Sequence, residues 1–126
     1  MKKIAVKINF SHHLCAKNVN WVILIIAGLF EVAFASCLAK AKDATGNSAI
    51  MWYTGFLIAL TASMLLLIKA TQTLPIGTAY AVWTGVGAVG TVLMGIFFFN
   101  DPVSFWRIFF ITTLIGSIAG LKAVSS

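Results

Sequence analysis

Charged residues are scarce in this sequence, and acidic residues are scarcer still. Of 126 residues, 10% are charged and 60% are hydrophobic, and only three are Asp or Glu. A soluble domain of ordinary composition is about 25% charged, so this chain cannot cover a folded surface with polar groups. The composition excludes the ordinary soluble classes and indicates an integral membrane protein.

Cysteine and histidine are also too few for most catalytic or metal sites. The two cysteines, Cys15 and Cys37, have neither the spacing of a zinc motif nor that of a disulfide framework. Both histidines, His12 and His13, stand beside Cys15 near the N-terminus, where a solvated tail is a better interpretation than a loose metal site. We therefore expect no enzyme, no metal and no cofactor.

The sequence contains instead four long apolar runs separated by short polar turns. A helix needs about 20 residues to cross about 30 Å of hydrocarbon. The runs predict an all-α membrane protein with four transmembrane helices, at residues 21–39, 49–68, 75–99 and 104–121. Residues 1–20 lack the apolar core of a secretory signal. We interpret them as a flexible N-terminal extension that precedes a four-helix transmembrane domain at residues 21–123.

The net charge of +6 has an explanation in the membrane rather than in nucleic acid. The basic residues lie in the extension, in a loop and near the helix ends, and no basic patch is interleaved with aromatics. With four spans, one side carries six Lys and Arg and the other carries three, which predicts the N-terminus inside. Without the extension the count is two to three, so the core has almost no preferred orientation.

Three glycines in the third run, Gly85, Gly87 and Gly90, match the G-x-G-x-x-G spacing of a dinucleotide-binding loop. That motif acts only where it follows a strand and opens a helix. Here the glycines lie inside an apolar stretch with no charge between Lys69 and Asp101, so we reject the nucleotide interpretation. Glycines let helices approach closely in lipid and also soften a helix. Close packing and a hinge at Gly85 and Gly87 therefore both remain open.

Glu31 is the one acidic residue inside a predicted span. It follows Trp21 by ten residues, or about 15 Å along the axis, which places it near the bilayer midplane. A carboxyl group at that depth is costly unless it faces a partner, water or a cavity. Its dry surroundings disfavour the charged form, so the group can exchange protons and can also attract a cation. We favour this function over the alternative of a protonated Glu31 that only joins two helices.

Aromatic side chains lie at a similar depth. Phe34 is one helical turn from Glu31, and Tyr80 and Trp83 share one face of the third span with Gly87. The negative face of an aromatic ring attracts cations. These residues are therefore candidates for lining a cation cavity around the acid, although each taken alone is more often a packing residue.

The segments "AGLFEVAFA" around Glu31 and "LPIGTAYAVWTGVGAVGT" in the third span resemble the small multidrug resistance transporters of the bacterial inner membrane. The resemblance covers residues 21–123. It implies that Glu31 binds a proton and a cationic substrate alternately, and that two copies of the chain form an antiparallel homodimer in the lipid bilayer.

The resemblance also implies roles for individual residues. Ser63 is expected to form a hydrogen bond near the glutamate, Tyr80 and Trp83 to line the pocket, and the segment from Gly85 to Gly87 to bend the third helix. In the fourth span, Gly116 and Gly120 form a small-xxx-small pair. Such a pair suits helix–helix contact, and we assign it to dimer packing.

The motif "WTGVGAVGT" is more similar to the guanidinium exporter branch than to the exporters of polyaromatic cations. Guanidinium exporters usually carry tryptophan three residues after the glutamate, where this chain has Phe34, which lacks the indole N–H donor. We expect a proton-coupled antiporter that exports small guanidinium-like cations. The alternatives are an exporter of quaternary ammonium compounds and a membrane scaffold that does not transport.

Overall fold

Four helices joined by short turns make up the structure. The computed structural model describes the backbone of residues 1–125 and the side chains of residues 1, 3–4 and 12–125. The helices are α1 (Lys2–Asp43), α2 (Asn47–Ala70), α3 (Ile76–Phe98) and α4 (Phe105–Ser125). Each contains a segment long and apolar enough to cross a membrane, which in α1 is His12–Asp43. The prediction of an all-α membrane protein with four spanning helices is confirmed.

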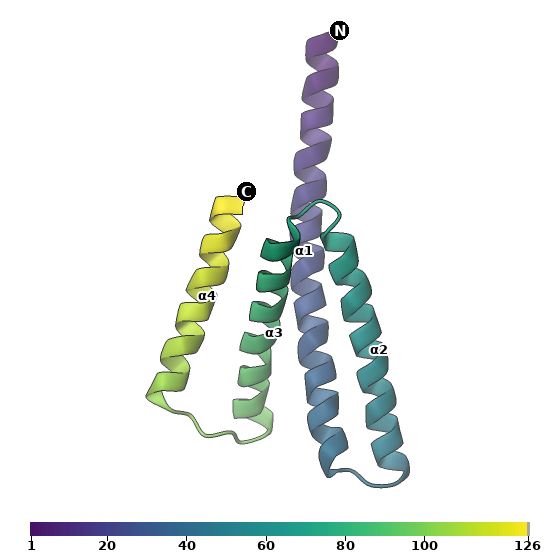
Figure 1. Cartoon of the computed structure of the whole chain (residues 1–126), viewed down its shortest axis with the longest axis vertical. Helices are drawn as coiled ribbons and strands as arrows, with labels where there is room; N and C mark the ends of the chain where they lie inside the picture. The colour runs from purple at the N-terminus through teal and green to yellow at the C-terminus, as the bar shows by residue number, and fades with distance from the viewer. Residues whose placement is uncertain (126) are drawn as a thin grey trace.

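The helices run up and down beside one another (Figure 1). α1 packs against both α2 and α3, whereas α4 packs on α3 at the outside of the bundle. The α1–α2 and α3–α4 turns lie at one end, and the α2–α3 turn and the C-terminus lie at the other. α4 has no buried residue in its described length, so this side of the bundle is open.

The predicted spans agree with the helices to within four residues at every end except the start of α1. Pro75 stands immediately before α3 as its N-cap, where the missing N–H does no harm. α1 continues back through residues 2–20 without a break, so its 42 residues rise about 63 Å. The extension is therefore helical, and its flexibility stays a prediction.

The α3–α4 turn is closed by hydrogen bonds and an ion pair. Asn100 takes a positive φ of 55°, a conformation that asparagine tolerates better than most residues. The Asp101 N–H then donates to the Gly95 carbonyl at 3.0 Å, and its carboxylate accepts from the Arg107 guanidinium at 3.0 Å. Arg107, which lies one turn inside α4, thus turns its charge back toward the end of the helix.

The opposite end of the bundle is joined by polar contacts between distant parts of the chain. Asn20 Nδ2 donates to Thr73 Oγ1 at 2.6 Å, which ties α1 to the α2–α3 turn. Lys17 Nζ donates to the Ser125 carbonyl at 2.6 Å, which ties α1 to the last residue of α4. Both chain ends of the membrane domain are therefore held at the same level.

Small residues allow α1 and α3 to pack at close range. A Cβ built on Gly28 would lie 2.7 Å from Val86 Cγ1 and 2.8 Å from Val86 Cβ. The Val86 Cβ is fixed to the α3 backbone, so it cannot move aside as the end of a long side chain can. Gly28 is thus required by the distance between the two helices.

Gly28→Ala should lower the free energy of unfolding by about 1–3 kcal/mol, the usual range for an overpacked core, because the added methyl group pushes α3 away from α1. The measurement is denaturation of the purified protein in detergent micelles, followed by circular dichroism. Gly77→Ala in α3 is the matched control, since no atom lies within 4 Å of a Cβ built there. Equal losses in the two variants would contradict the close contact.

Candidate functional site

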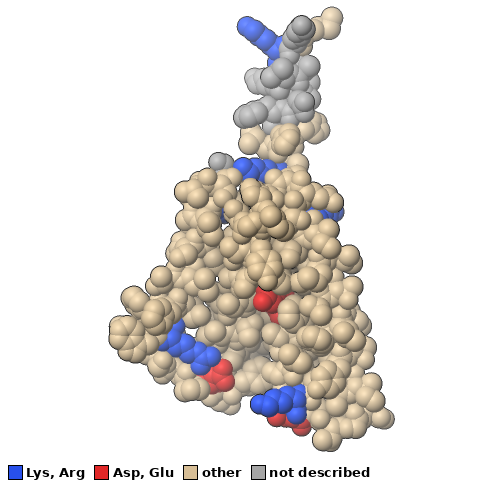
Figure 2. All heavy atoms as spheres, in the orientation of Figure 1, with Lys and Arg blue, Asp and Glu red and all other residues tan. Residues whose placement is uncertain are grey.

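Glu31 lies on the side of α1 that faces α3. Its side chain occupies the space that Gly87 leaves open, because a Cβ built on Gly87 would overlap the Glu31 carboxyl group. Figure 2 shows acidic atoms at mid-height on one face of the bundle, surrounded by uncharged atoms, while the basic atoms gather toward the two ends. The acid therefore sits far from the charged ends of the helices.

One carboxyl oxygen of Glu31 is buried without a partner. Oε2 has no hydrogen-bond partner in the part of the chain that the structure describes. Among these same residues the one ion pair joins Arg107 and Asp101 at the α3–α4 turn. A buried carboxylate without a partner is strongly unfavourable, so this oxygen requires a proton, a cation or water. The arrangement can bind either a proton or a cation.

A chain of hydrogen bonds joins three helices beside the acid. Ser63 Oγ of α2 donates to the Ala27 carbonyl of α1 at 2.7 Å, and Trp83 Nε1 of α3 donates to Ser63 Oγ at 3.0 Å. Ser63 is fully buried, and only 7% of Trp83 is exposed. Ala27 precedes Glu31 by one helical turn, so the network fixes α2 and α3 against the turn of α1 that leads to the acid.

Tyr80 and Phe34, the other two aromatic residues predicted for the pocket, contact residues of different helices. Tyr80 packs beside Trp83, with ring centroids 5.4 Å apart, and is 56% exposed. Phe34 packs edge to face on Phe56 of α2, with centroids 5.8 Å apart, whereas Glu31 lies against α3. The structure thus brings Ser63, Trp83 and Tyr80 together and gives Phe34 a separate contact.

Gly85, Gly87 and Gly90 of α3 each receive a side chain from a neighbouring helix. The space at Gly85 is filled by Ile118 of α4, and the space at Gly90 is filled by Val32 of α1. α3 is helical from Ile76 to Phe98 without interruption. These contacts give the glycines a packing role in the single chain, and the hinge at Gly85 and Gly87 stays a prediction.

Gly116 and Gly120 of α4 have open surroundings. No atom lies within 4 Å of a Cβ built on either residue. The described part of the chain therefore does not make the contact predicted for this pair, and their role in dimer packing stays a prediction.

Two parts of the site were not predicted from the sequence. The Ala27 carbonyl accepts the Ser63 hydroxyl, but a backbone acceptor in a helix leaves no mark in the residue pattern. The sequence indicated that Gly87 shares a helix face with Tyr80 and Trp83 and could act as a hinge. It did not indicate that the missing side chain of Gly87 leaves the space for the Glu31 carboxyl group. Gly28, one turn before Glu31, is the signal that could have indicated a close α1–α3 contact at this depth.

Fold and site together define a class, a helical membrane protein with four spans and, between them, a glutamate whose Oε2 is buried without a partner in the described residues. The family model described as Small Multidrug Resistance protein matches residues 19–114. The chain belongs to the small multidrug resistance family, as its resemblance indicated.

Several relatives match over nearly their whole length. The chain is 42% identical over 106 residues to the probable guanidinium efflux system subunit GdnD of Bacillus licheniformis, covering 84% of this chain and 99% of the relative. It is 45% identical over 105 residues to the guanidinium exporter of Yersinia pseudotuberculosis, covering 83% and 98%. It is 41% identical over 103 residues to the guanidinium exporter of Escherichia coli, covering 82% and 95%. With four spanning helices and bacterial relatives, the chain is a multi-pass protein of the bacterial inner membrane.

Ser63→Ala should destabilise the protein by about 1–3 kcal/mol, because the buried Trp83 N–H loses its acceptor. The free energy of unfolding in detergent is the quantity to measure. In a Trp83→Phe background the same change should have a smaller effect, since no indole N–H is left unpaired. Thr61→Ala, which removes an exposed hydroxyl bonded within α2, is the control. A Ser63→Ala effect that is unchanged in the Trp83→Phe background would contradict the network.

Proposed function

We propose that this chain is a proton-coupled antiporter that exports small guanidinium-like cations, with Glu31 binding the proton and the cation in turn. The observation that carries the proposal is the buried Glu31 Oε2, which has no partner in the described chain. Three relatives with 41–45% identity that are named as guanidinium exporters or as a guanidinium efflux subunit support the choice of substrate.

Coupling follows from the competition of two positive ligands for one carboxyl group. Protonated Glu31 is neutral and is tolerated in its dry surroundings. A guanidinium ion that reaches the site offers paired N–H donors to the carboxylate, the geometry that makes arginine–carboxylate pairs strong. The proton must leave for this pair to form, so each side of the membrane exchanges one ligand for the other.

The neighbouring side chains suit a planar cation. The Tyr80 and Trp83 rings pack together and can present a ring face to the cation. Ser63 holds the Trp83 indole in place through its hydroxyl. We assign the pocket to these three residues together with Phe34, and the bend that opens the pocket to Gly85 and Gly87.

The functional unit in this proposal is an antiparallel homodimer formed by residues 21–123. In its described length α4 has no buried residue, and Gly116 and Gly120 leave room for another helix to approach. The near balance of basic residues in the core suits insertion in both orientations, while the extension at residues 1–20 favours one.

Export of quaternary ammonium compounds is the second candidate function. Phe34 favours it, because a phenyl ring attracts such cations without offering them a hydrogen bond. A scaffold without transport, in which Glu31 only joins helices, is the third. Transport measurements separate all three.

Glu31→Gln should abolish guanidinium uptake driven by a pH gradient, down to the level of protein-free liposomes. The amide has almost the shape of the acid but cannot exchange a proton in this pH range, so the fold is kept and the coupling is lost. Addition of guanidinium to the detergent-solubilised protein should release protons from the parent chain and not from this variant.

Asp43→Asn is the matched control, because Asp43 is an exposed acid at the end of the same helix. It should keep transport and proton release. Guanidinium uptake that persists in Glu31→Gln, or that is lost equally in Asp43→Asn, would overturn the role of Glu31 and favour the scaffold.

Phe34→Trp should raise the ratio of guanidinium to tetramethylammonium transport by about fivefold, the effect of one added hydrogen bond of about 1 kcal/mol. Both ions are measured in the same liposomes. Phe30→Trp, one turn earlier and exposed, is the control and should leave the ratio unchanged. An unchanged ratio in Phe34→Trp would count against the guanidinium branch.

A further inference from the structure

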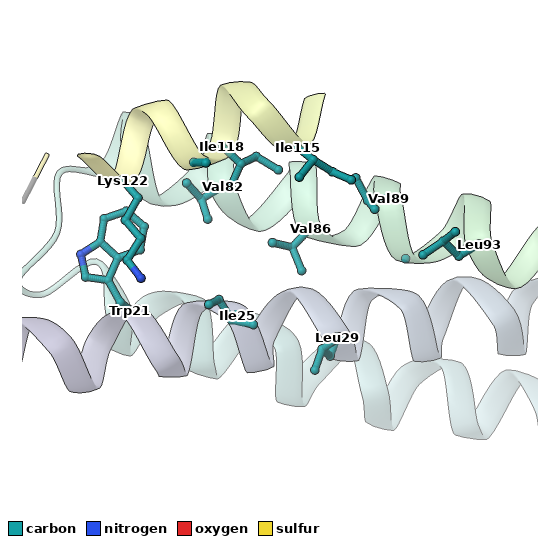
Figure 3. A pocket seen from close by; sticks show the side chains of 12 residues that line it. Trp21, Ile25, Leu29, Val82, Val86, Val89, Leu93, Ile115, Ile118 and Lys122 are labelled. Atoms are coloured by element: carbon teal, nitrogen blue, oxygen red, sulfur yellow. The ribbon is translucent and has the colours of Figure 1, made fainter. Parts of the chain in front are cut away.

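A groove with apolar sides runs between α1, α3 and α4, away from the Glu31 site (Figure 3). It has a volume of about 410 Å³. Its sides are formed by Ile25 and Leu29 of α1, Val82 and Val86 of α3, and Ile115 and Ile118 of α4. With no polar group along these sides, water has no partners in the groove, so hydrocarbon is its natural content.

One end of the groove differs from the rest. Trp21 and Lys122 meet there, with the Lys122 Nζ 5.8 Å from the centre of the indole ring. Trp21 is 4% exposed, and its Nε1 donor is buried without a hydrogen-bond partner in the described part of the chain. A buried donor that lacks an acceptor is unfavourable, so this end of the groove is incomplete in the chain alone.

The polar end also lies at the level of the membrane surface. Lys17, one turn before Trp21, donates to the carbonyl of Ser125 at the end of α4, so the helix ends and the ring are at the same height. Lys122 is exposed and its long side chain runs beside the Trp21 ring (Figure 3).

We infer that the groove binds one acyl chain of an anionic phospholipid, whose phosphate lies between the Lys122 ammonium and the Trp21 indole N–H. An anionic lipid complements the groove, because it is apolar along its length and carries a negative charge at one end, where the groove carries Lys122 and Trp21. The phosphate supplies the acceptor that Trp21 lacks and a counter-charge for Lys122. A zwitterionic lipid brings its own cation and gains less.

A second copy of the chain fits this end less well. An antiparallel neighbour brings Lys40, Lys42 and Arg107 to the same level together with Asp43 and Asp101, of which Asp101 is already paired with Arg107. Three basic minus two acidic residues leave that end with a charge of +1, so it offers Lys122 no net counter-charge. The groove is thus matched to a negative headgroup by charge as well as by shape.

The test is quenching of tryptophan fluorescence by brominated lipids, with the full chain reconstituted in phosphatidylcholine vesicles that contain phosphatidylglycerol. Brominated phosphatidylglycerol should occupy the groove about fivefold more readily than brominated phosphatidylcholine, the effect expected of one lysine beside an anionic group. Trp21→Phe should remove the part of the quenching that shows this preference. Lys122→Gln should bring the ratio of quenching by brominated phosphatidylglycerol to quenching by brominated phosphatidylcholine close to one. Because Lys122 is exposed, this variant should keep the fold.

Lys40→Gln is the matched control, because Lys40 Nζ lies over the Phe99 ring at 5.4 Å in a similar contact at the opposite end of the bundle. It should leave the preference of Trp21 intact. Ala119→Phe places a ring in the groove and should reduce quenching of Trp21 by either lipid. The proposal is overturned by equal quenching from both lipids or by equal losses in the two lysine variants.

Discussion

The short distance between α1 and α3 is the constraint on which the site depends. Gly28 and Gly90 let side chains of the facing helix approach the backbone, and Gly87 leaves the space that the Glu31 carboxyl group occupies. In lipid the hydrophobic effect contributes little to helix association, so close packing of this kind holds the helices together. The same contact that stabilises the bundle therefore buries one carboxyl oxygen of Glu31, while the residue as a whole stays partly exposed.

α2 is fixed to this pair by polar contacts rather than by small residues. Ser63 bonds to the backbone of α1 and accepts from the Trp83 indole of α3. Every donor in this set is satisfied, so the network can be buried without penalty. The carboxyl group one turn further along α1 has an oxygen without such a partner. The network is thus satisfied and the acid is not, and the proposed binding role of Glu31 rests on this difference.

Much of the fold could be predicted from the sequence, because lipid imposes a simple rule on length and polarity. The four apolar runs gave the helices to within a few residues, and Pro75 gave the start of α3. The course of α1 before Trp21 was missed as a helix, since those residues carry no apolar run. The contact between Glu31 and Gly87 was missed for a different reason. A glycine in the sequence shows that a side chain is absent, but not which neighbour fills the space.

α1 presents a polar residue on one face and apolar residues on the opposite face. Successive residues of a helix are rotated by about 100°, so Leu29 in the groove and Glu31 in the site point about 200° apart. Leu29 lines the groove with α3 and α4, while the Glu31 side chain enters the α3 contact at Gly87. In the proposed antiport, a cation and its water would meet Glu31 on the face of α1 opposite the groove, where water has no polar partner. The two faces of α1 thus separate the carboxyl group at Gly87 from the apolar groove that α3 and α4 complete.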